Sequence, residues 1–217
     1  MSHQSHKREH DVPREATEHY HHPAAWPDEK LLHDCEIDYG RTSGPGGQHR
    51  NRVATEVTLT HRSTGLRASA GERRSPEENK HMALRRLRLK LAVEHRTGME
   101  AGEEGSALWK SRLAPPAKQV KKKEPRDPVF KELGVQLRDE AQGEGGMRIA
   151  CNPKHHDYPS LLAEALDAIE AAGWEPKGAA VRLGVSMSQL IKLVKDYSAA
   201  WVRLNAEREK RGMHKLK

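Results

Sequence analysis

The hydrophobic residues of this chain alternate with polar residues up to about residue 70 and then shift to helical spacing. Cys35, Ile37 and Tyr39 share one side of residues 33–39, which predicts a strand. Residues 53–60 predict a short helical turn followed by a second strand, and residues 66–70 alternate again after a turn at residues 63–65. The pattern therefore predicts a hairpin preceded by one further strand.

A long amphipathic helix is predicted over residues 75–96. Ser75 is a favourable N-cap, Pro76 suits the first helical position, and Glu78 completes a capping box. The apolar side is expected to face a core and the basic side to face elsewhere; these sides hold Ala83, Leu84, Leu87 and Leu91, and Arg85, Arg86, Arg88 and Lys90. With the strands, this helix predicts a small α+β domain over residues 31–97, with three or four strands.

Residues 98–157 contain glycine and proline too often for a long element, and they predict a linker. The basic run Lys121-Lys122-Lys123 favours a solvated stretch over an RNA-backbone contact. Residues 147–150 predict a short extended piece within this linker.

Helical spacing returns over residues 158–217, which predict a small all-α module with a basic tail. An amphipathic helix that begins near residue 158 is ended by Gly173. A second, short helix precedes a turn at Gly184-Val185-Ser186, and a third helix is expected from Met187 through Leu204.

The turn of this module resembles a helix-turn-helix of the kind that ends Fis-type regulators. The resemblance rests on Ala179 and Ala180, which permit close packing, on Gly184 in the turn, and on Ser186 as the cap of the following helix. A three-helix packing module without nucleic-acid contact explains the same residues equally well. The exposed side of the last helix is only modestly basic, with Lys192 and Lys195.

Composition favours small domains joined by polar linker over a single large core. Of the 217 residues 35% are hydrophobic, and the mean hydropathy is −0.90. No apolar run reaches the length of a membrane helix and no secretory signal is present, so a cytoplasmic protein without a membrane partner is expected. Cys35 and Cys151 are expected to be buried thiols and not to form a disulfide.

The net charge of +7 is concentrated in one segment. Residues 40–96 carry 13 Lys or Arg against five acids, a local excess of +8, which indicates a surface that faces a polyanion. Residues 1–30 are rich in histidine, but their irregular spacing favours a disordered tail over a metal site. No metal and no cofactor are predicted.

The chemistry of the chain is expected in the loop at residues 40–52. Gly44, Pro45, Gly46 and Gly47 exclude a helix or central strand, and they allow the backbone to approach another molecule closely. Gln48 follows them inside a frame of basic residues. Composition alone leaves open whether this is a plain turn between two strands.

The run Ser43-Gly44-Pro45-Gly46-Gly47-Gln48-His49, with Asn51, resembles the GGQ loop of class I peptide-chain release factors. The downstream sequence agrees over about residues 31–96, notably at Arg74-Ser75 and Asn79-Lys80. The resemblance departs at Arg50 and Arg52, where a small apolar residue and a lysine are expected; both changes keep or add positive charge.

The resemblance implies a partner and a reaction. The partners are the rRNA of the large ribosomal subunit and P-site peptidyl-tRNA, whose ester is hydrolysed. Because glutamine does not titrate and the loop offers no general base, a factor that completes an RNA-built site fits better than an independent hydrolase. The implied catalytic residues are Gly46, Gly47 and Gln48, and the predicted RNA-binding residues are Arg41, His49, Arg50, Asn51, Arg52, Arg73, Arg74 and Lys80.

Only about 30 residues precede the first strand, which leaves no room for stop-codon-reading domains. The resemblance is therefore closest to codon-independent ribosome-rescue factors, in which a basic tail lies in the mRNA channel. Here the helical module takes the place of that tail. It is expected to contact the mRNA channel or another nucleic acid. The alternative is a nucleic-acid-binding regulator or ribosome-associated adaptor that uses the C-terminal helices. Coupling to RNA repair or decay on damaged ribosomes is a third interpretation.

Overall fold

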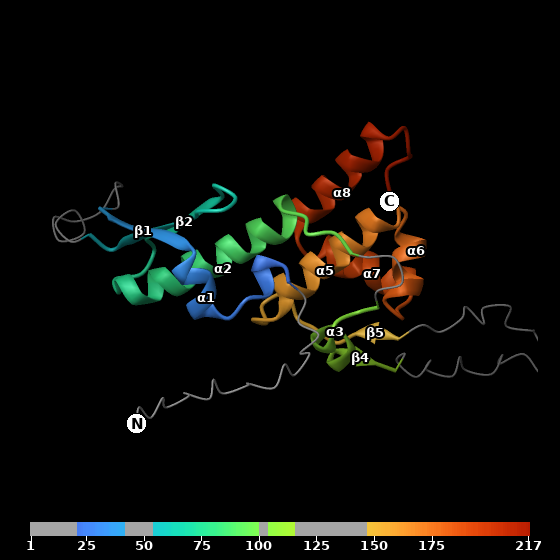
Figure 1. Cartoon of the computed structure of the whole chain (residues 1–217), viewed down its shortest axis with the longest axis horizontal. Helices are drawn as coiled ribbons and strands as arrows, with labels where there is room; N and C mark the ends of the chain where they lie inside the picture. Colours follow the sequence, from blue (N-terminus) through green and yellow to red (C-terminus); the bar gives the residue numbers. More distant parts are fainter. Residues whose placement is uncertain (1–20, 42–53, 100–103, 116–146) are drawn as a thin grey trace, which may run out of the picture.

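A computed structural model describes residues 21–41, 54–99, 104–115 and 147–217 (Figure 1). It contains a three-stranded antiparallel sheet in the order β1-β2-β3, formed by β1 (Cys35–Gly40), β2 (Glu56–His61) and β3 (Arg67–Ala70). Leu59 of β2 pairs with Ile37 on one side and Ala68 on the other. Val57, Leu59 and His61 are buried and alternate with half-buried residues, so one face of the sheet contacts the core, as the period of two predicts.

Helix α2 (Pro76–Glu94) connects the two ends of the molecule. Its first turn is capped by Ser75, whose Oγ accepts a hydrogen bond from the backbone N–H of Glu78, as the sequence predicts. The predicted apolar side is buried at Ala83, Leu84, Leu87 and Leu91. Helix α2 packs against β2 and β3 and also against α5 (Tyr158–Ala171), so it is shared by the sheet and the C-terminal helices (Figure 1).

Helix α5 differs from its prediction, because it is buried along every side and not only along one. Every residue from Tyr158 to Ile169 is buried. The helix is followed by α6 (Pro176–Arg182), α7 (Met187–Lys195) and α8 (Ser198–Lys210), as Figure 1 shows. The single helix expected from Met187 to Leu204 is wrong: Tyr197 adopts an extended conformation with φ −124° and ψ 105°, which separates α7 from α8.

The segment expected to be a tail through residue 30 packs into the molecule from His22 onward. It forms a 3-10 turn, η1 (Pro23–Ala25), and helix α1 (Asp28–His33). The backbone carbonyl of Ala24, which is fully buried, accepts hydrogen bonds from Arg88 Nη1 at 2.7 Å and from Ser160 Oγ at 3.1 Å. This turn therefore lies between α2 and α5, and the expectation of a disordered tail is wrong for residues 22–30.

The predicted linker over residues 98–157 also contains ordered structure. Helix α3 (Ala107–Ser111) places Trp109 in the core, where its Nε1–H donates to the carbonyl of Leu183 at 2.9 Å. Strands β4 (Leu113–Ala114) and β5 (Arg148–Ile149) pair antiparallel, and β5 matches the predicted extended piece. The buried Trp109 is the physical reason for the correction, because it anchors the segment to the C-terminal helices.

The buried hydrophobic residues form one continuous core through the sheet, α2 and the C-terminal helices. The expectation of small domains without a common core is therefore wrong, whereas the α+β class is confirmed. Both cysteines are free thiols: Cys35 is buried and Cys151 is half-buried. Among the described residues, no helix combines the length and apolar character that crossing a membrane requires.

Candidate functional site

The tip of the GGQ loop lies outside the described residues, and the strands at its two ends are described. The predictions for the tip therefore lie outside the described residues; they concern Gly46, Gly47, Gln48, His49, Arg50, Asn51 and Arg52, all within residues 42–53. The loop leaves β1 after Gly40 and returns before β2 at Glu56, and these two residues pair directly across the sheet. The loop therefore starts and ends at the same edge of neighbouring antiparallel strands.

Asn79 joins the returning end of the loop to the segment before α2. Its side chain is fully buried, and Nδ2 donates to the carbonyl of Thr55 at 2.6 Å and to the carbonyl of Arg73 at 2.9 Å. Its Oδ1 accepts from the backbone N–H of Arg73 at 2.9 Å. The sequence analysis noted Asn79 and Lys80 as part of the family resemblance but assigned Asn79 no role. An asparagine in the first turns of a helix, next to residues that form the core, is the signal that could have identified it.

The structure brings the described members of the predicted RNA-binding set to this same edge. Arg41 directly follows β1 and is exposed, and Arg73 and Arg74 are exposed just before α2. Lys80 follows Asn79 on α2 and is half-buried. Among the residues that the structure describes, none of these four side chains takes part in an ion pair.

Arg85 and Arg88 of α2, and Arg96 just after it, are used inside the molecule, which corrects the view that the whole basic segment faces a polyanion. Arg85 donates to the carbonyls of Pro153 and His155 at 2.6 and 3.1 Å. Arg88 bonds to Asp28, and Arg96 bonds to the buried Asp167. These contacts fasten the N-terminal turn and the C-terminal helices to α2, so only part of the local excess of +8 remains for a partner.

The charge of the open sheet face also restricts the direction of approach. Glu36, Asp38 and Glu56 lie on the face opposite Val57 and Leu59, because they alternate with the core residues in register. Acidic side chains repel a phosphate backbone. Arg67, which pairs with Thr60, adds one exposed cation to this face, so three acids stand against one cation there. The face is therefore less favourable to a polyanion than the loop edge with Arg41, Arg73, Arg74 and Lys80.

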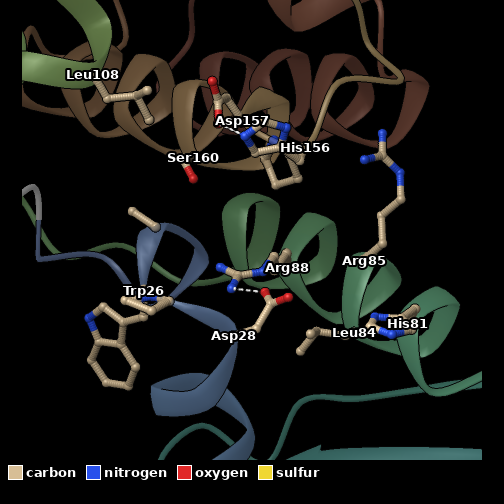
Figure 2. A pocket seen from close by; sticks show the side chains of 13 residues that line it. Trp26, Asp28, His81, Leu84, Arg85, Arg88, Leu108, His156, Asp157 and Ser160 are labelled. Atoms are coloured by element: carbon tan, nitrogen blue, oxygen red, sulfur yellow. Dashed lines mark hydrogen bonds and ion pairs between the residues drawn. The ribbon is translucent and has the colours of Figure 1, made fainter. Parts of the chain in front are cut away.

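A pocket of about 480 Å³ lies between α1, α2 and the start of α5 (Figure 2). Its two arginines, Arg85 and Arg88, already donate to backbone carbonyls and to Asp28. Figure 2 shows Arg88 turned toward Asp28. The pocket therefore lies where α1, α2 and α5 pack against one another, and none of the predicted site residues that the structure describes lines it.

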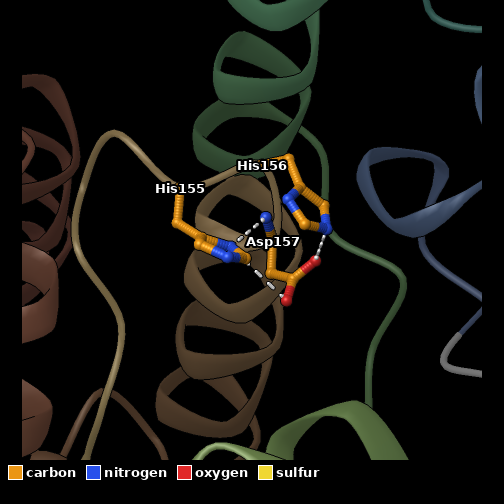
Figure 3. Close-up of side chains that lie close together, drawn as sticks. All are labelled: His155, His156 and Asp157. Carbon is orange, nitrogen blue, oxygen red and sulfur yellow. Dashed lines mark hydrogen bonds and ion pairs between the residues drawn. The ribbon is translucent and has the colours of Figure 1, made fainter.

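A histidine pair at the start of α5 is explained by its contacts within the chain (Figure 3). His156 Nε2 lies 2.7 Å from Asp157 Oδ1, and His155 Nδ1 lies 3.5 Å from Oδ2. Asp157 also accepts a two-pronged hydrogen bond from the guanidinium of Arg112. A fixed cation on this carboxylate opposes a metal ion at the same atoms, so the cluster acts as an ion-pair joint between α5 and residue 112.

The helix-turn-helix resemblance stays a prediction. Helices α6 and α7 flank the expected turn, Gly184 has a positive φ of 68°, and Ser186 Oγ accepts from the backbone N–H of Gln189. On the exposed side of α7, however, Lys192 pairs with Asp196 at 2.8 Å, and Lys195 donates to the carbonyl of Lys217. The two lysines that the sequence offers for phosphate contact thus have partners within the chain.

Comparison with known proteins agrees with the loop sequence. Residues 31–132 match the RF-1 domain family. Peptide chain release factor 1 of Rickettsia typhi is 38% identical over 76 residues, which cover 35% of this chain and 21% of that protein. Release factor 1 of Rubrobacter xylanophilus is 47% identical over 58 residues, covering 27% and 16%, and release factor 2 of Campylobacter jejuni is 35% identical over 80 residues, covering 35% and 22%.

Residues 31–132 of this chain are thus an RF-1 domain, the GGQ domain of class I release factors. The similar region corresponds to about a fifth of the length of these curated relatives. The resemblance stated from residues 31–96 is confirmed, and the matched region extends beyond the predicted boundary at residue 97.

Proposed function

We propose that this protein promotes hydrolysis of the ester that joins the nascent peptide to tRNA on stalled ribosomes, without reading a stop codon. The observation that carries the proposal is the RF-1 domain, with the GGQ sequence placed between paired Gly40 and Glu56. Its partners are peptidyl-tRNA in the P site and the rRNA of the large subunit. The unpaired basic side chains at the loop edge support an RNA partner.

The chemistry proposed for the loop is electrostatic. The backbone N–H of Gln48 donates to the oxyanion or to the leaving 3′ oxygen, a contribution of about 2.7–4 kcal/mol in comparable oxyanion donors. The side chain of Gln48 orders the attacking water and excludes larger nucleophiles. Gly46 and Gly47 allow the bend that aims this N–H, since a Cβ atom there would restrict the backbone. The rRNA supplies the rest of the site.

Independence from a stop codon is supported by what packs against the RF-1 domain. In the described residues this is the helical module of α5 to α8, which is fastened to α2 by Arg96, Asp167 and a continuous core. The module is proposed to hold the domain against the ribosome through exposed basic residues near its end, such as Lys210, Arg211 and Lys215. These three exposed side chains pair with Glu207 and Glu209, and surface ion pairs are weak enough to exchange for contacts with phosphate. Contacts of this kind position a protein on RNA and carry no sequence information.

The proposal is tested with ribosomes that carry labelled peptidyl-tRNA in the P site. Three complexes are compared: mRNA truncated after the P-site codon, a sense codon in the A site, and a stop codon in the A site. We expect peptide release from the truncated complex, with no further increase when a stop codon is present. Release only at stop codons would refute codon independence, and no release while a known release factor 1 is active would refute the function itself.

Two glycine variants separate catalysis from folding. Gly47→Ala is expected to lower the release rate by about 10²–10³-fold, the range for loss of one oxyanion donor, without a change in the unfolding temperature. Gly178→Ala is the matched control, because Gly178 lies on α6 and an added Cβ would lie 3.4 Å from the Cβ of Ala172. The control is expected to keep the full rate; equal rates for the two variants would contradict the assigned role of the loop.

A further inference from the structure

We propose that Asn79 is a positioning residue that holds Thr55, at the returning end of the GGQ loop, and the basic segment at Arg73-Arg74 in a fixed relation. The inference rests on the proposed function, because it concerns how the same loop is presented to its substrate. Its basis is the set of three hydrogen bonds made by one fully buried amide. Thr55 and Arg73 are 18 residues apart in sequence, and both bond to this side chain.

The chemistry of the three contacts requires an amide. Two backbone carbonyls, of Thr55 and Arg73, face Nδ2, and one backbone N–H, of Arg73, faces Oδ1. Both N–H groups of the amide are therefore used as donors, and its oxygen is used as an acceptor. A carboxylate would place oxygen against two carbonyls, and an aliphatic side chain would leave buried backbone groups without a partner, at a cost in free energy.

The position of these contacts connects them to the loop. Thr55 is the residue between the loop and β2, so the bond to its carbonyl fixes the returning end of the loop. The departing end is fixed separately, by the pairing of Gly40 with Glu56. Because the loop must place a backbone N–H within about 0.5 Å of its productive position, a shift at either end reduces the rate.

The same amide also places the proposed RNA contacts. Arg73 is bonded to Asn79 through both its backbone N–H and its carbonyl, while its side chain is exposed. Ser75, two residues later, caps α2, so the segment between β3 and α2 is held at both ends. Thr55, at the returning end of the loop, and the backbone of Arg73 are therefore held by the same side chain.

Two variants of the full-length protein separate the contact with Thr55 from the contact with the N–H of Arg73. Asn79→Leu has a similar volume and removes all three hydrogen bonds. Asn79→Asp keeps an oxygen for the N–H of Arg73 and loses the amide donors to Thr55. Val93→Ala is the control, because Val93 is buried at the far end of α2 and its truncation lowers stability without contact to the loop.

The readouts are single-turnover peptide release at increasing protein concentration, thermal unfolding, and hydrogen exchange of backbone amides. We expect both Asn79 variants to lower the maximal rate at least tenfold while the half-saturating concentration changes less than threefold. The amide of Arg73 is expected to exchange at least tenfold faster in Asn79→Leu and to stay protected in Asn79→Asp. Amides of residues 54–57 are expected to exchange faster in both variants.

The outcome is decisive in each case. If the Asn79 variants lose no more activity than Val93→Ala at equal stability, the positioning role is refuted. If the unaltered protein releases no peptide, the proposed function fails, and hydrogen exchange alone tests the positioning role. Faster exchange at residues 54–57 in the Asn79 variants, but not in Val93→Ala, supports the role. Unchanged exchange at these residues overturns it.

Discussion

Arg96, just beyond the end of α2, and Asp167, in the middle of α5, form an ion pair in which Nη1 lies 2.8 Å from Oδ1. The side chain of Asp167 has no solvent exposure, and it also accepts hydrogen bonds from the backbone N–H and the hydroxyl of Thr97. This pair joins the RF-1 domain to the C-terminal helices. It makes the two regions, which the sequence suggests are separated by a linker, into one packed unit.

Replacing Arg96 is therefore expected to destabilise the protein strongly. Arg96→Met leaves a buried carboxylate without its cation, and we expect a loss of about 3–5 kcal/mol in the free energy of unfolding. Urea denaturation followed by circular dichroism measures this loss. Arg86→Met is the matched control, because Arg86 pairs with Glu72 at the surface and its loss costs below about 1 kcal/mol. Similar losses for both variants would contradict the buried joint.

The buried His22 is expected to make folding sensitive to acid. Burial is the main cause that lowers its pKa from 6.5 to about 4, and the charge of Asp167 opposes this shift. In the neutral ring, Nδ1 accepts from the backbone N–H of Ala24 at 3.0 Å and Nε2 lies 3.2 Å from the carbonyl of His95. Protonation removes the acceptor at Nδ1.

The sign of the pH effect follows from the lowered pKa. Stability is complete above pH 6.5 and falls by up to about 3 kcal/mol as the pH decreases to 4, because the unfolded chain takes up the proton first. His22→Gln is expected to flatten this part of the curve, while His81→Gln, at an exposed position, leaves it unchanged. Equal slopes for His22→Gln and the unaltered protein, measured by denaturant unfolding at each pH, would disprove the assignment.

A chain that ends at residue 157 is expected not to fold cooperatively. Truncation removes α5, whose residues 158 to 169 are all buried, and exposes the side of α2 that packs against it. A thermal melt followed by circular dichroism is expected to lack a sharp transition. A truncated protein with the midpoint of the full chain would show that the RF-1 domain is independent of the module, so the role of the module is better studied with surface substitutions.

Charge removal at the loop edge is expected to weaken ribosome binding in a salt-dependent way. The double change Arg73→Ala and Arg74→Ala removes two exposed cations, and it should reduce the slope of log affinity against log salt by about 2. The measurement is binding to ribosomes between low and physiological salt. Lys154→Ala, an exposed cation distant in sequence from the loop edge, is the control, and an equal change in slope for it would argue against a localised interface.

Local patterns in the sequence determined the RF-1 part of the fold. Alternation around Ile37 and Leu59 specified the strands, and Ser75 with Pro76 specified the start of α2, because these features depend on neighbouring residues only. The glycines around Gln48 identified the loop and its family. The residue types of the loop indicate its chemistry, because recognising them requires no knowledge of contacts with distant segments.

Only the tertiary structure decided which polar and basic residues are used internally. Arg85, Arg88 and Arg96 look like a basic surface in sequence. Yet each bonds to a residue 60 or more positions away, namely His155, Asp28 and Asp167, in segments that sequence spacing cannot pair with them. The burial of Trp109 and of His22, and the bond of Asn79 to the carbonyl of Thr55, depend on similar long-range contacts. A hydrogen bond between distant segments exists only once the chain has brought them together, so the sequence identified the loop and the structure identified what holds it.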